Sequence, residues 1–287
     1  MTIARINGIE LYYECVGQGP PLLLIHGLGS SGDDWAFQRE AFARRHRLIL
    51  IDLRGSGRSA KPPGPYSMAQ FAGDVWELLD RLGIATLDVL GFSLGGSVAI
   101  EMALARPAAV RRMILCNALA DYRTDTPRKW LEAHLQITLV RLLGVRRTSR
   151  LIARRMFPRP EQAPMRQRLI DVVGGNPHAA YLATIRAIVG WSALERLHAL
   201  TCATLLIAAE HDYTSVAVRR AEAARYPRAE LAVIAGSRHG TPFDAIEAFN
   251  ACALEFLARS IDSPGHVDAF AIDEAAGVAR AHRVQHG

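Results

Sequence analysis

Cysteine is scarce in this chain, and the few cysteines present are far apart. Four occur in 287 residues, namely Cys15, Cys116, Cys202 and Cys252, and none forms a Cys-x-x-Cys pair. Disulfide frameworks and cysteine metal sites require closer spacing or more cysteines. We therefore expect neither a disulfide scaffold nor a metal site, and we expect the four thiols to be reduced and buried.

Long apolar runs are also missing. No stretch approaches the roughly 18 apolar residues of a membrane-spanning helix. Met1 leads into a short alternating stretch, whereas a secretory signal has a charged leader followed by an apolar core. These patterns predict a cytoplasmic protein.

Positive charge is confined to one segment. Residues 122–197 hold 14 Lys and Arg against 5 Asp and Glu, an excess of nine, whereas the rest of the chain has 20 against 23. The segment lacks interleaved aromatic residues, a helix-turn-helix pattern and a zinc pattern, so we expect no nucleic-acid partner. Its arginines suit solvated helix faces or the attraction of anionic substrates. Residues 130–157 suit either packing over an active site or contact with an anionic membrane surface.

Apolar runs alternate with helix-length segments over most of the chain. Runs typical of strands buried on both faces occur at 22–25, 48–51, 87–90, 113–116, 205–208 and 231–234. Segments of helical length span 33–45, 68–82, 94–106, 215–226 and 243–257. The alternation predicts an α/β fold with a mostly parallel sheet. Asn7-Gly8 predicts a hairpin turn ahead of it.

Two segments depart from this alternation. Residues 121–200 have the pattern of several helices separated by prolines and a Gly-Gly pair, which predicts an inserted helical cap. Residues 1–120 and 201–257 would then form the core. We expect residues 258–287 to be a mobile C-terminal extension and assign them no function.

A serine framed by glycines follows the third of these apolar runs. Gly91, Ser93 and Gly95 have the G-x-S-x-G spacing, which lets the chain turn sharply from strand to helix and hold the serine in a strained conformation. The helix beginning near Leu94 directs unpaired amides and its positive dipole end towards the hydroxyl. Serine is also a good helix N-cap, so the pentapeptide alone suits either a nucleophile or a capped turn.

A nucleophilic serine requires a base, and the base requires an acid to orient it. His239 is the candidate base because it directly follows the last apolar run, at the sheet edge where loops carry catalytic groups. Asp212 follows the preceding strand and is the candidate acid, with Glu210 and Asp121 as alternatives. Since Ser93, Asp212 and His239 each lie just past a predicted strand, their joint placement predicts a catalytic triad.

Two backbone amides are candidates for an oxyanion hole. One belongs to Leu94, and the other to Leu28 in the turn after the first buried strand. Glycines on both sides of Leu28 would let the backbone approach the site. His26 is expected to shape this turn and, with Phe92, to border the substrate pocket.

Together these motifs resemble the α/β-hydrolase family over residues 5–257. The resemblance rests on the His-Gly turn at 26, Asp-Leu-Arg-Gly at 52–55, Gly-Phe-Ser-Leu-Gly-Gly at 91–96, Asp212 and His239. It implies an α/β-hydrolase fold, with a mostly parallel eight-stranded sheet, helices on both faces and a helical cap. It also assigns the nucleophile, acid and base to Ser93, Asp212 and His239. The 52–55 loop is structural in most members, so we expect no catalytic role for it.

The resemblance implies a serine hydrolase that cleaves a small-molecule ester or lactone through an acyl-enzyme, without metal or organic cofactor. Residues 31–35 and 91–96 are also similar to cofactor-free haloperoxidases and perhydrolases, and the layout is similar to enol-lactonases. Carbon-carbon bond hydrolases of this fold remain an alternative. Epoxide hydrolases and haloalkane dehalogenases usually have aspartate at the nucleophile position, so Ser93 argues against them. The oligomeric state stays open.

A rival motif overlaps the turn at 27. Residues 27–32 match G-x-G-x-x-G after a strand, and Asp52 ends the next strand, which is the spacing of a dinucleotide-binding fingerprint. That hypothesis leaves Ser93, Asp212 and His239 unexplained, whereas a hydrolase uses the same turn for its oxyanion hole. A non-catalytic ligand receptor with the hydrolase fold is the remaining alternative.

Overall fold

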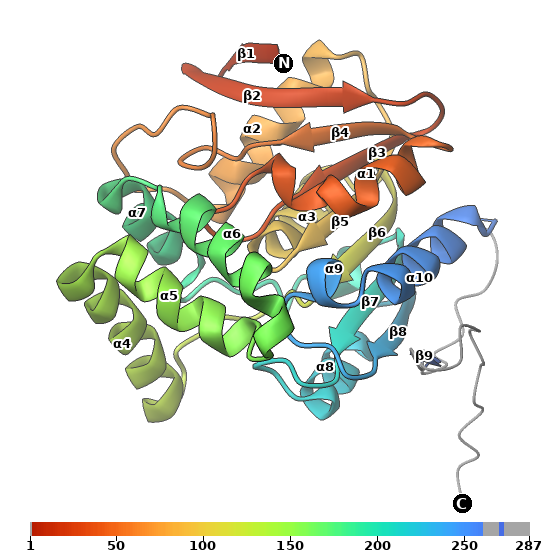
Figure 1. The fold of residues 1–287 in the computed structure, drawn as a ribbon. Coiled ribbons are helices and arrows are strands. Elements are labelled where there is room, and N and C mark those ends of the chain that lie inside the picture. Colours follow the sequence, from red (N-terminus) through yellow and green to blue (C-terminus); the bar gives the residue numbers. More distant parts are fainter. Residues whose placement is uncertain (1, 261–269, 273–287) are drawn as a thin grey trace, which may run out of the picture.

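The computed structural model describes residues 2–260 and 270–272, and one sheet runs through it (Figure 1). Its strands are β1 (Thr2–Ile6), β2 (Ile9–Val16), β3 (Pro21–Ile25), β4 (Arg47–Ile51), β5 (Leu87–Phe92), β6 (Val110–Cys116), β7 (Ala203–Ala209), β8 (Ala229–Ile234) and β9 (Phe270–Ile272). Their spatial order is β1-β2-β4-β3-β5-β6-β7-β8-β9. Among the described strands, the β1–β2 and β2–β4 pairs are antiparallel and the other pairs are parallel. The prediction of an α/β fold with a mostly parallel sheet is confirmed.

The short strand β9 adds a ninth strand to the eight that we expected. It pairs in parallel with β8 over three residues and so covers backbone groups at that edge of the sheet. It belongs to the segment that we expected to be mobile. Residues 258–260 of that segment are described and begin with Ala258, the last residue of a helix, whereas residues 261–269 and 273–287 lie outside the described residues.

Helices cover both faces of the sheet. The helices in the described residues are α1 (Ala36–Ala43), α2 (Met68–Arg81), α3 (Leu94–Ala105), α4 (Pro127–Leu143), α5 (Val145–Met156), α6 (Ala163–Gly174), α7 (His178–Ile188), α8 (Val216–Ala223), α9 (Thr241–Asp244) and α10 (Ile246–Ala258). Helices α2, α3 and α8 cover one face of the sheet, and α1, α9 and α10 cover the other. Short 3₁₀ turns occur at η1 (Gly32–Trp35), η2 (Pro160–Gln162) and η3 (Leu197–Ala199). The segment predicted as one helix at 33–45 thus begins as a 3₁₀ turn, and the closing helix is broken at Ala245.

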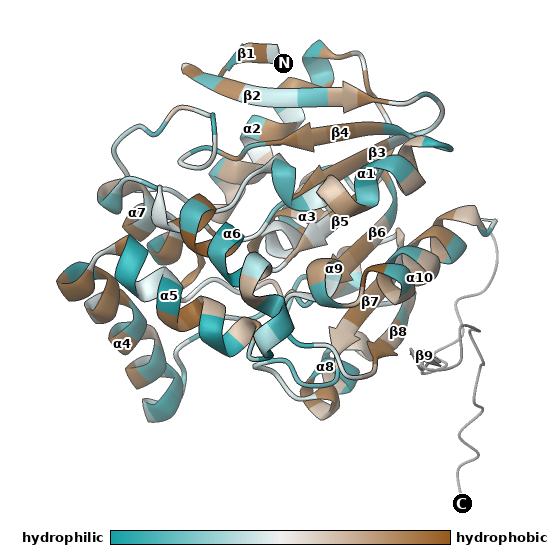
Figure 2. Ribbon diagram, in the orientation of Figure 1, coloured by the Kyte–Doolittle hydropathy of each residue, from teal (hydrophilic) through white to brown (hydrophobic). Residues whose placement is uncertain are grey.

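Each buried strand feeds two hydrophobic cores because successive side chains point to opposite faces. Leu23 and Ile25 of β3 pack with α2 and α3, whereas Leu22 and Leu24 pack with α1 and α10. This double burial explains why the strands are continuous apolar runs in the sequence. Figure 2 shows the strands largely hydrophobic, whereas the outer helices are mixed.

The four cysteines do not all follow the prediction. All are free thiols, and Cys116 and Cys202 are buried. Cys252 is partly buried and Cys15 is exposed, so the expectation of burial was wrong for Cys15. Cys15 lies in the second half of β2, where most side chains are only partly covered.

Four helices, α4 to α7, lie between β6 and β7 in the chain. An isolated antiparallel bridge between Asp121 and Ser192 joins the two ends of this segment. The segment contacts the loop after β3 through the Asn176 side chain, which donates to the Gly29 carbonyl at 2.5 Å. It contacts the loop after β8 through Arg159, which donates to the Gly236 carbonyl. These helices therefore sit at the carboxyl ends of the parallel strands (Figure 1). No helix among the described residues is long and apolar enough to cross a membrane.

Candidate active site

Ser93 occupies a strained turn between β5 and α3. Its φ of 52° and ψ of −118° lie in a region that side-chain-bearing residues rarely adopt. Its amide donates to the Cys116 carbonyl at 2.9 Å, which ties the turn to the neighbouring strand. This is the sharp, strained turn that the G-x-S-x-G pattern predicted.

The two glycines of the pattern are required because backbone segments meet closely here. A Cβ on Gly91 would lie 2.4 Å from the Gly95 carbonyl carbon, and one on Gly95 would lie 2.2 Å from the Ile25 carbonyl oxygen. Both distances are far shorter than a van der Waals contact. A side chain at Gly91 would push the start of α3 away from β5, and one at Gly95 would push it away from the end of β3.

The structure brings Ser93, His239 and Asp212 together. His239 Nε2 lies 3.1 Å from Ser93 Oγ, and His239 Nδ1 lies 2.7 Å from Asp212 Oδ1. With the Nδ1 proton directed at the carboxylate, Nε2 is free to accept the serine proton. The side chains of His239 and Asp212 are only 14% and 5% exposed, so little water competes for these hydrogen bonds.

Two aromatic rings contact the His239 imidazole. Tyr213 stacks on it with ring centroids 4.7 Å apart, and Phe92 lies 5.4 Å away. The Tyr213 amide also donates to Asp212 Oδ1 at 2.6 Å, so one residue orients both partners. Phe92 is buried between His239 and Phe243. Sequence reasoning missed Tyr213, although its position directly after the acid was a usable signal.

Asn117 holds the loop that carries His239, and sequence reasoning missed it as well. Its side-chain nitrogen donates to the His239 carbonyl at 2.8 Å and to Thr241 Oγ1 at 2.7 Å. Its side-chain oxygen accepts from the Ala209 amide at 2.9 Å. Asn117 thereby joins the ends of β6, β7 and β8. The available signal was an asparagine directly after a buried strand.

The predicted oxyanion donors adjoin Ser93. A Cβ on Gly27 would lie 3.6 Å from Ser93 Cβ, so the turn containing Leu28 faces the serine. Leu94 follows Ser93 as the first residue of α3. Within the described part of the chain, neither amide donates a hydrogen bond to a protein acceptor. Both amides are therefore available for negative charge that develops beside Ser93.

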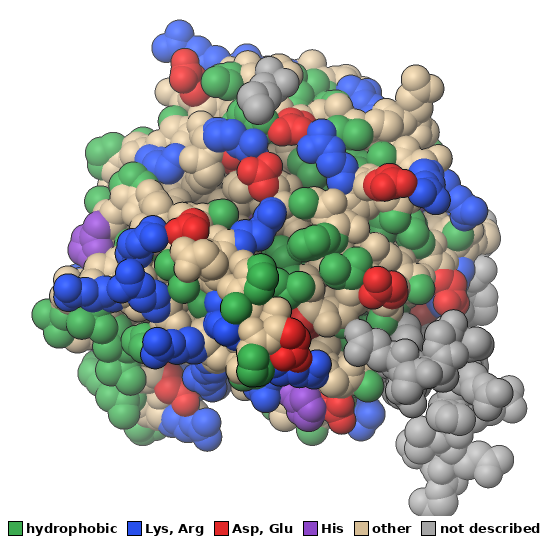
Figure 3. Space-filling view, in the orientation of Figure 1, with side chains coloured by type: hydrophobic (Ala, Val, Ile, Leu, Met, Phe, Trp, Pro, Cys, Tyr) green, Lys and Arg blue, Asp and Glu red, His purple; other side chains and the backbone are tan. Residues whose placement is uncertain are grey.

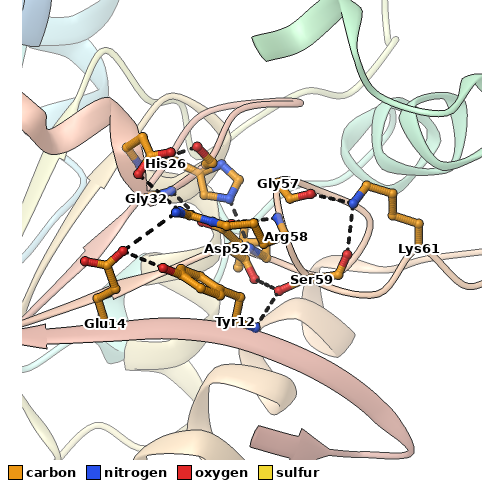
Figure 4. Close-up of polar contacts among 12 residues, drawn as sticks. Tyr12, Glu14, His26, Gly32, Asp52, Gly57, Arg58, Ser59 and Lys61 are labelled. Carbon is orange, nitrogen blue, oxygen red and sulfur yellow. Dashed lines mark hydrogen bonds and ion pairs between the residues drawn. The ribbon is translucent and has the colours of Figure 1, made fainter. Parts of the chain in front are cut away.

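His26 does not border a pocket as we expected. The side chain is fully buried, with Nδ1 2.7 Å from the Gly27 carbonyl and Nε2 accepting from the Leu53 amide at 3.0 Å. Burial lowers its pKa. The ring joins the turn after β3 to the loop after β4, because both of its nitrogens contact backbone (Figure 4).

The Asp52 carboxylate is fully hydrogen-bonded to neighbouring loops. Its carboxylate accepts from the Gly32 amide at 2.7 Å, from the Arg58 amide at 2.7 Å and from Arg58 Nε at 2.8 Å (Figure 4). Burial alone would raise the pKa of Asp52, but the hydrogen bonds from Arg58 and Gly32 and the neighbouring His26 together outweigh it, and the pKa is lowered. Both carboxylate oxygens that a ribose would need are thus engaged, which removes the basis of the dinucleotide hypothesis. The loop has the structural role that we expected.

Asp34 lies in the same region and contacts the turn after β3. It is buried and accepts a hydrogen bond from Ser30 Oγ at 2.5 Å. Burial raises its pKa to about 7. Among the residues that the structure describes, no group of three or more His, Cys, Asp or Glu is arranged to hold a metal ion.

Comparison with known proteins agrees with this geometry. The α/β-hydrolase fold family model matches residues 20–166, which is about half of the chain. The chain belongs to the α/β-hydrolase fold family. It is 29% identical to "Putative carbamate hydrolase RutD" of Caulobacter sp. (strain K31) over 271 residues, which cover 90% of this chain and 98% of that protein.

Solved structures of this family are also similar over nearly the whole chain. The enol-lactonase from Burkholderia xenovorans LB400 is 26% identical with a TM-score of 0.83, and the match covers 90% of this chain and 100% of that one. A thermophilic esterase from Thermogutta terrifontis is 27% identical with a TM-score of 0.79 and covers 90% and 98%. This α/β-hydrolase is therefore an enzyme of a hydrolytic family.

Proposed function

We propose that this α/β-hydrolase cleaves a small carboxylic ester or lactone through an acyl-enzyme on Ser93. The observation that carries the proposal is the continuous chain from Ser93 Oγ through His239 to Asp212, with contacts of 3.1 and 2.7 Å. Structural capping would require neither this chain nor the strained backbone at Ser93. Similarity to an enol-lactonase and an esterase supports the same substrate class.

The reaction would proceed in two halves. Ser93 Oγ attacks the carbonyl carbon while His239 Nε2 takes its proton, and Asp212 stabilises the resulting imidazolium. The amides of Leu28 and Leu94 then donate to the oxyanion, each contributing on the order of 3 kcal/mol. His239 returns the proton to the leaving alkoxide, which departs as an alcohol. His239 next takes a proton from a water molecule, whose oxygen attacks the acyl carbon. The bond to Ser93 Oγ then breaks, the acid leaves, and His239 returns the proton to Ser93 Oγ.

A carbamate is a second candidate substrate. The relative that is 29% identical over 90% of this chain carries that activity in its name, and a carbamate also presents a carbonyl to the serine. The same residues would act, with an amine or an alcohol as the leaving group.

The test is a substrate panel of aryl esters of increasing acyl length, lactones, and alkyl carbamates, with Ser93→Ala as the control. We expect turnover of esters or lactones and an acyl adduct on the Ser93 peptide by mass spectrometry after rapid quenching. Turnover by Ser93→Ala near the parent rate would overturn the mechanism. Turnover restricted to carbamates would replace the ester proposal with the second candidate.

A further inference from the structure

The outward side of α4 carries large apolar side chains that no described residue covers. Exposed hydrophobic residues of α4 and the adjoining α5 are Trp130, Leu131, Leu135, Leu142, Leu143 and Leu151. Leu131 is 60% exposed and Leu142 is 76% exposed. Only Val140 of this seventeen-residue helix is buried. Packing over the active site therefore does not account for these residues.

The exposed apolar residues share one side of α4. Leu131, Leu135 and Leu142 are spaced by four and seven residues, which returns to the same side of a helix. Trp130 stacks on His134 with ring centroids 3.9 Å apart. The opposite side attaches to α7, where Val140 packs against Leu182 and Ile185. A narrow apolar stripe thus attaches α4 to α7, whereas the broader apolar surface of α4 faces outward.

Positive charge surrounds this surface. Residues 127–156 contain eight Lys and Arg but one acidic residue, Glu132. Three of the cations, Arg128, Lys129 and Arg146, are in ion pairs. The side chains of Arg141, Arg147, Arg150 and Arg154 make no ion pair or hydrogen bond within residues 2–260 and 270–272.

The apolar and basic groups adjoin one another. Arg147, Arg150 and Arg154 lie at helical spacing on one side of α5, and Leu151 lies among them. Figure 3 shows hydrophobic side chains along the lower left edge, at the position of α4, with Lys and Arg side chains beside them. Exposed leucines and unpaired arginines therefore form one continuous surface.

We propose that α4 and α5 form a docking surface for an anionic lipid bilayer. The leucines would enter the boundary between headgroups and acyl chains, Trp130 would lie at headgroup level, and the arginines would contact lipid phosphates. A second copy of this chain is a poorer occupant, because two faces with the same excess of positive charge would repel each other. Since Arg155 of α5 lies 4.7 Å over the Tyr213 ring, docking would bring the candidate active site near the lipid surface.

Vesicle sedimentation with the full chain tests the proposal. Vesicles of phosphatidylcholine alone are compared with vesicles that also contain phosphatidylglycerol, each at low and high salt. We expect binding to the mixed vesicles, weakened by salt, and little binding to phosphatidylcholine. No binding to the mixed vesicles, or equal binding to both kinds, would overturn the proposal.

Two triple variants examine the two parts of the surface. Arg147→Gln with Arg150→Gln and Arg154→Gln should weaken binding about a hundredfold, at roughly fivefold per charge. Leu131→Ser with Leu135→Ser and Leu142→Ser should weaken it at least tenfold.

The matched controls change exposed residues elsewhere. They are the apolar triple Ile3→Ser, Phe37→Ser and Val218→Ser, and the basic triple Arg45→Gln, Arg220→Gln and Arg225→Gln. Equal loss of binding in test and control variants would contradict a defined surface. Hydrolysis of a water-soluble ester at the parent rate would verify that each variant is folded. A different outcome is that the parent protein does not bind vesicles but self-associates, and that the leucine triple variant abolishes this self-association. The face would then be an interface between copies, and the proposal would fail.

Discussion

The side-chain amide of Asn117 donates to the His239 carbonyl at 2.8 Å, although the two residues are 122 positions apart. Asn117 also has a φ of 47°, which asparagine tolerates better than most residues. The same side chain reaches Thr241 and accepts from the Ala209 amide. It therefore positions the base loop relative to the strand that precedes the acid.

Asn117→Gly tests this positioning role, since glycine accepts the positive φ and removes only the amide contacts. We expect kcat to fall roughly ten- to a hundredfold with little change in KM, because a small misplacement of a catalytic group is costly. The acidic limb of the kcat/KM pH profile should also shift. Asn7→Gly is the matched control, because Asn7 has a φ of 46° in a distant hairpin. An unchanged pH profile with lowered thermal stability would reduce Asn117 to a structural residue.

Ser93→Gly and Ser93→Ala should both be inactive but differ in stability. Alanine retains the strain at a φ of 52°, whereas glycine relieves it. Glycine also makes the unfolded chain more flexible, which offsets part of this gain. We therefore expect the free energy of unfolding of Ser93→Gly to be about 1 kcal/mol higher than that of Ser93→Ala. Denaturant unfolding measures the difference. A markedly less stable glycine variant would show that the turn is not strained.

Asp212→Asn should lower kcat roughly 10⁴-fold while leaving the fold intact, because an amide cannot stabilise the imidazolium and favours the wrong tautomer. Glu210→Gln is the control, since Glu210 is nearby but binds the Gly236 amide. Its kcat should stay within a few-fold of the parent. The assignment of the acid would be reversed if Glu210→Gln were the variant that lost activity.

Asp34 predicts a pH-dependent stability. Burial raises its pKa to about 7 from an ordinary value of 3.8, so the folded state binds this proton more tightly than the unfolded state. The resulting stabilisation is complete below the unfolded pKa and is lost as pH rises through the folded pKa. Asp34→Asn, which resembles the protonated form, should change little at acidic pH but raise the free energy of unfolding by up to about 4 kcal/mol at alkaline pH.

The control for Asp34 is Asp33→Asn, at an exposed neighbour whose side chain pairs with Arg58. Its effect on stability should be small and should lack this pH dependence. Chemical denaturation at several pH values measures both variants. A constant effect of Asp34→Asn across pH would contradict the raised pKa.

The sequence by itself determined the features that depend on local sterics and on burial. The G-x-S-x-G spacing predicted the turn at Ser93 because only glycines allow the backbone to approach so closely there. Continuous apolar runs predicted strands buried on both faces, and the placement of Asp212 and His239 after two of them predicted their proximity to the serine. Asn7-Gly8 predicted the hairpin, and both residues have the positive φ that it requires.

Only the tertiary structure decided which distant groups meet and which surfaces stay uncovered. The roles of Asn117 and Tyr213 depend on the adjacency of strand ends, and the complete burial of His26 depends on the loop after β4 closing over it. The outward leucines of α4 are the same residue type as the leucines of the core, so the sequence pattern could not show that they are exposed. Hydrophobicity records a tendency to be buried, whereas the packing of neighbouring helices determines whether a partner is present.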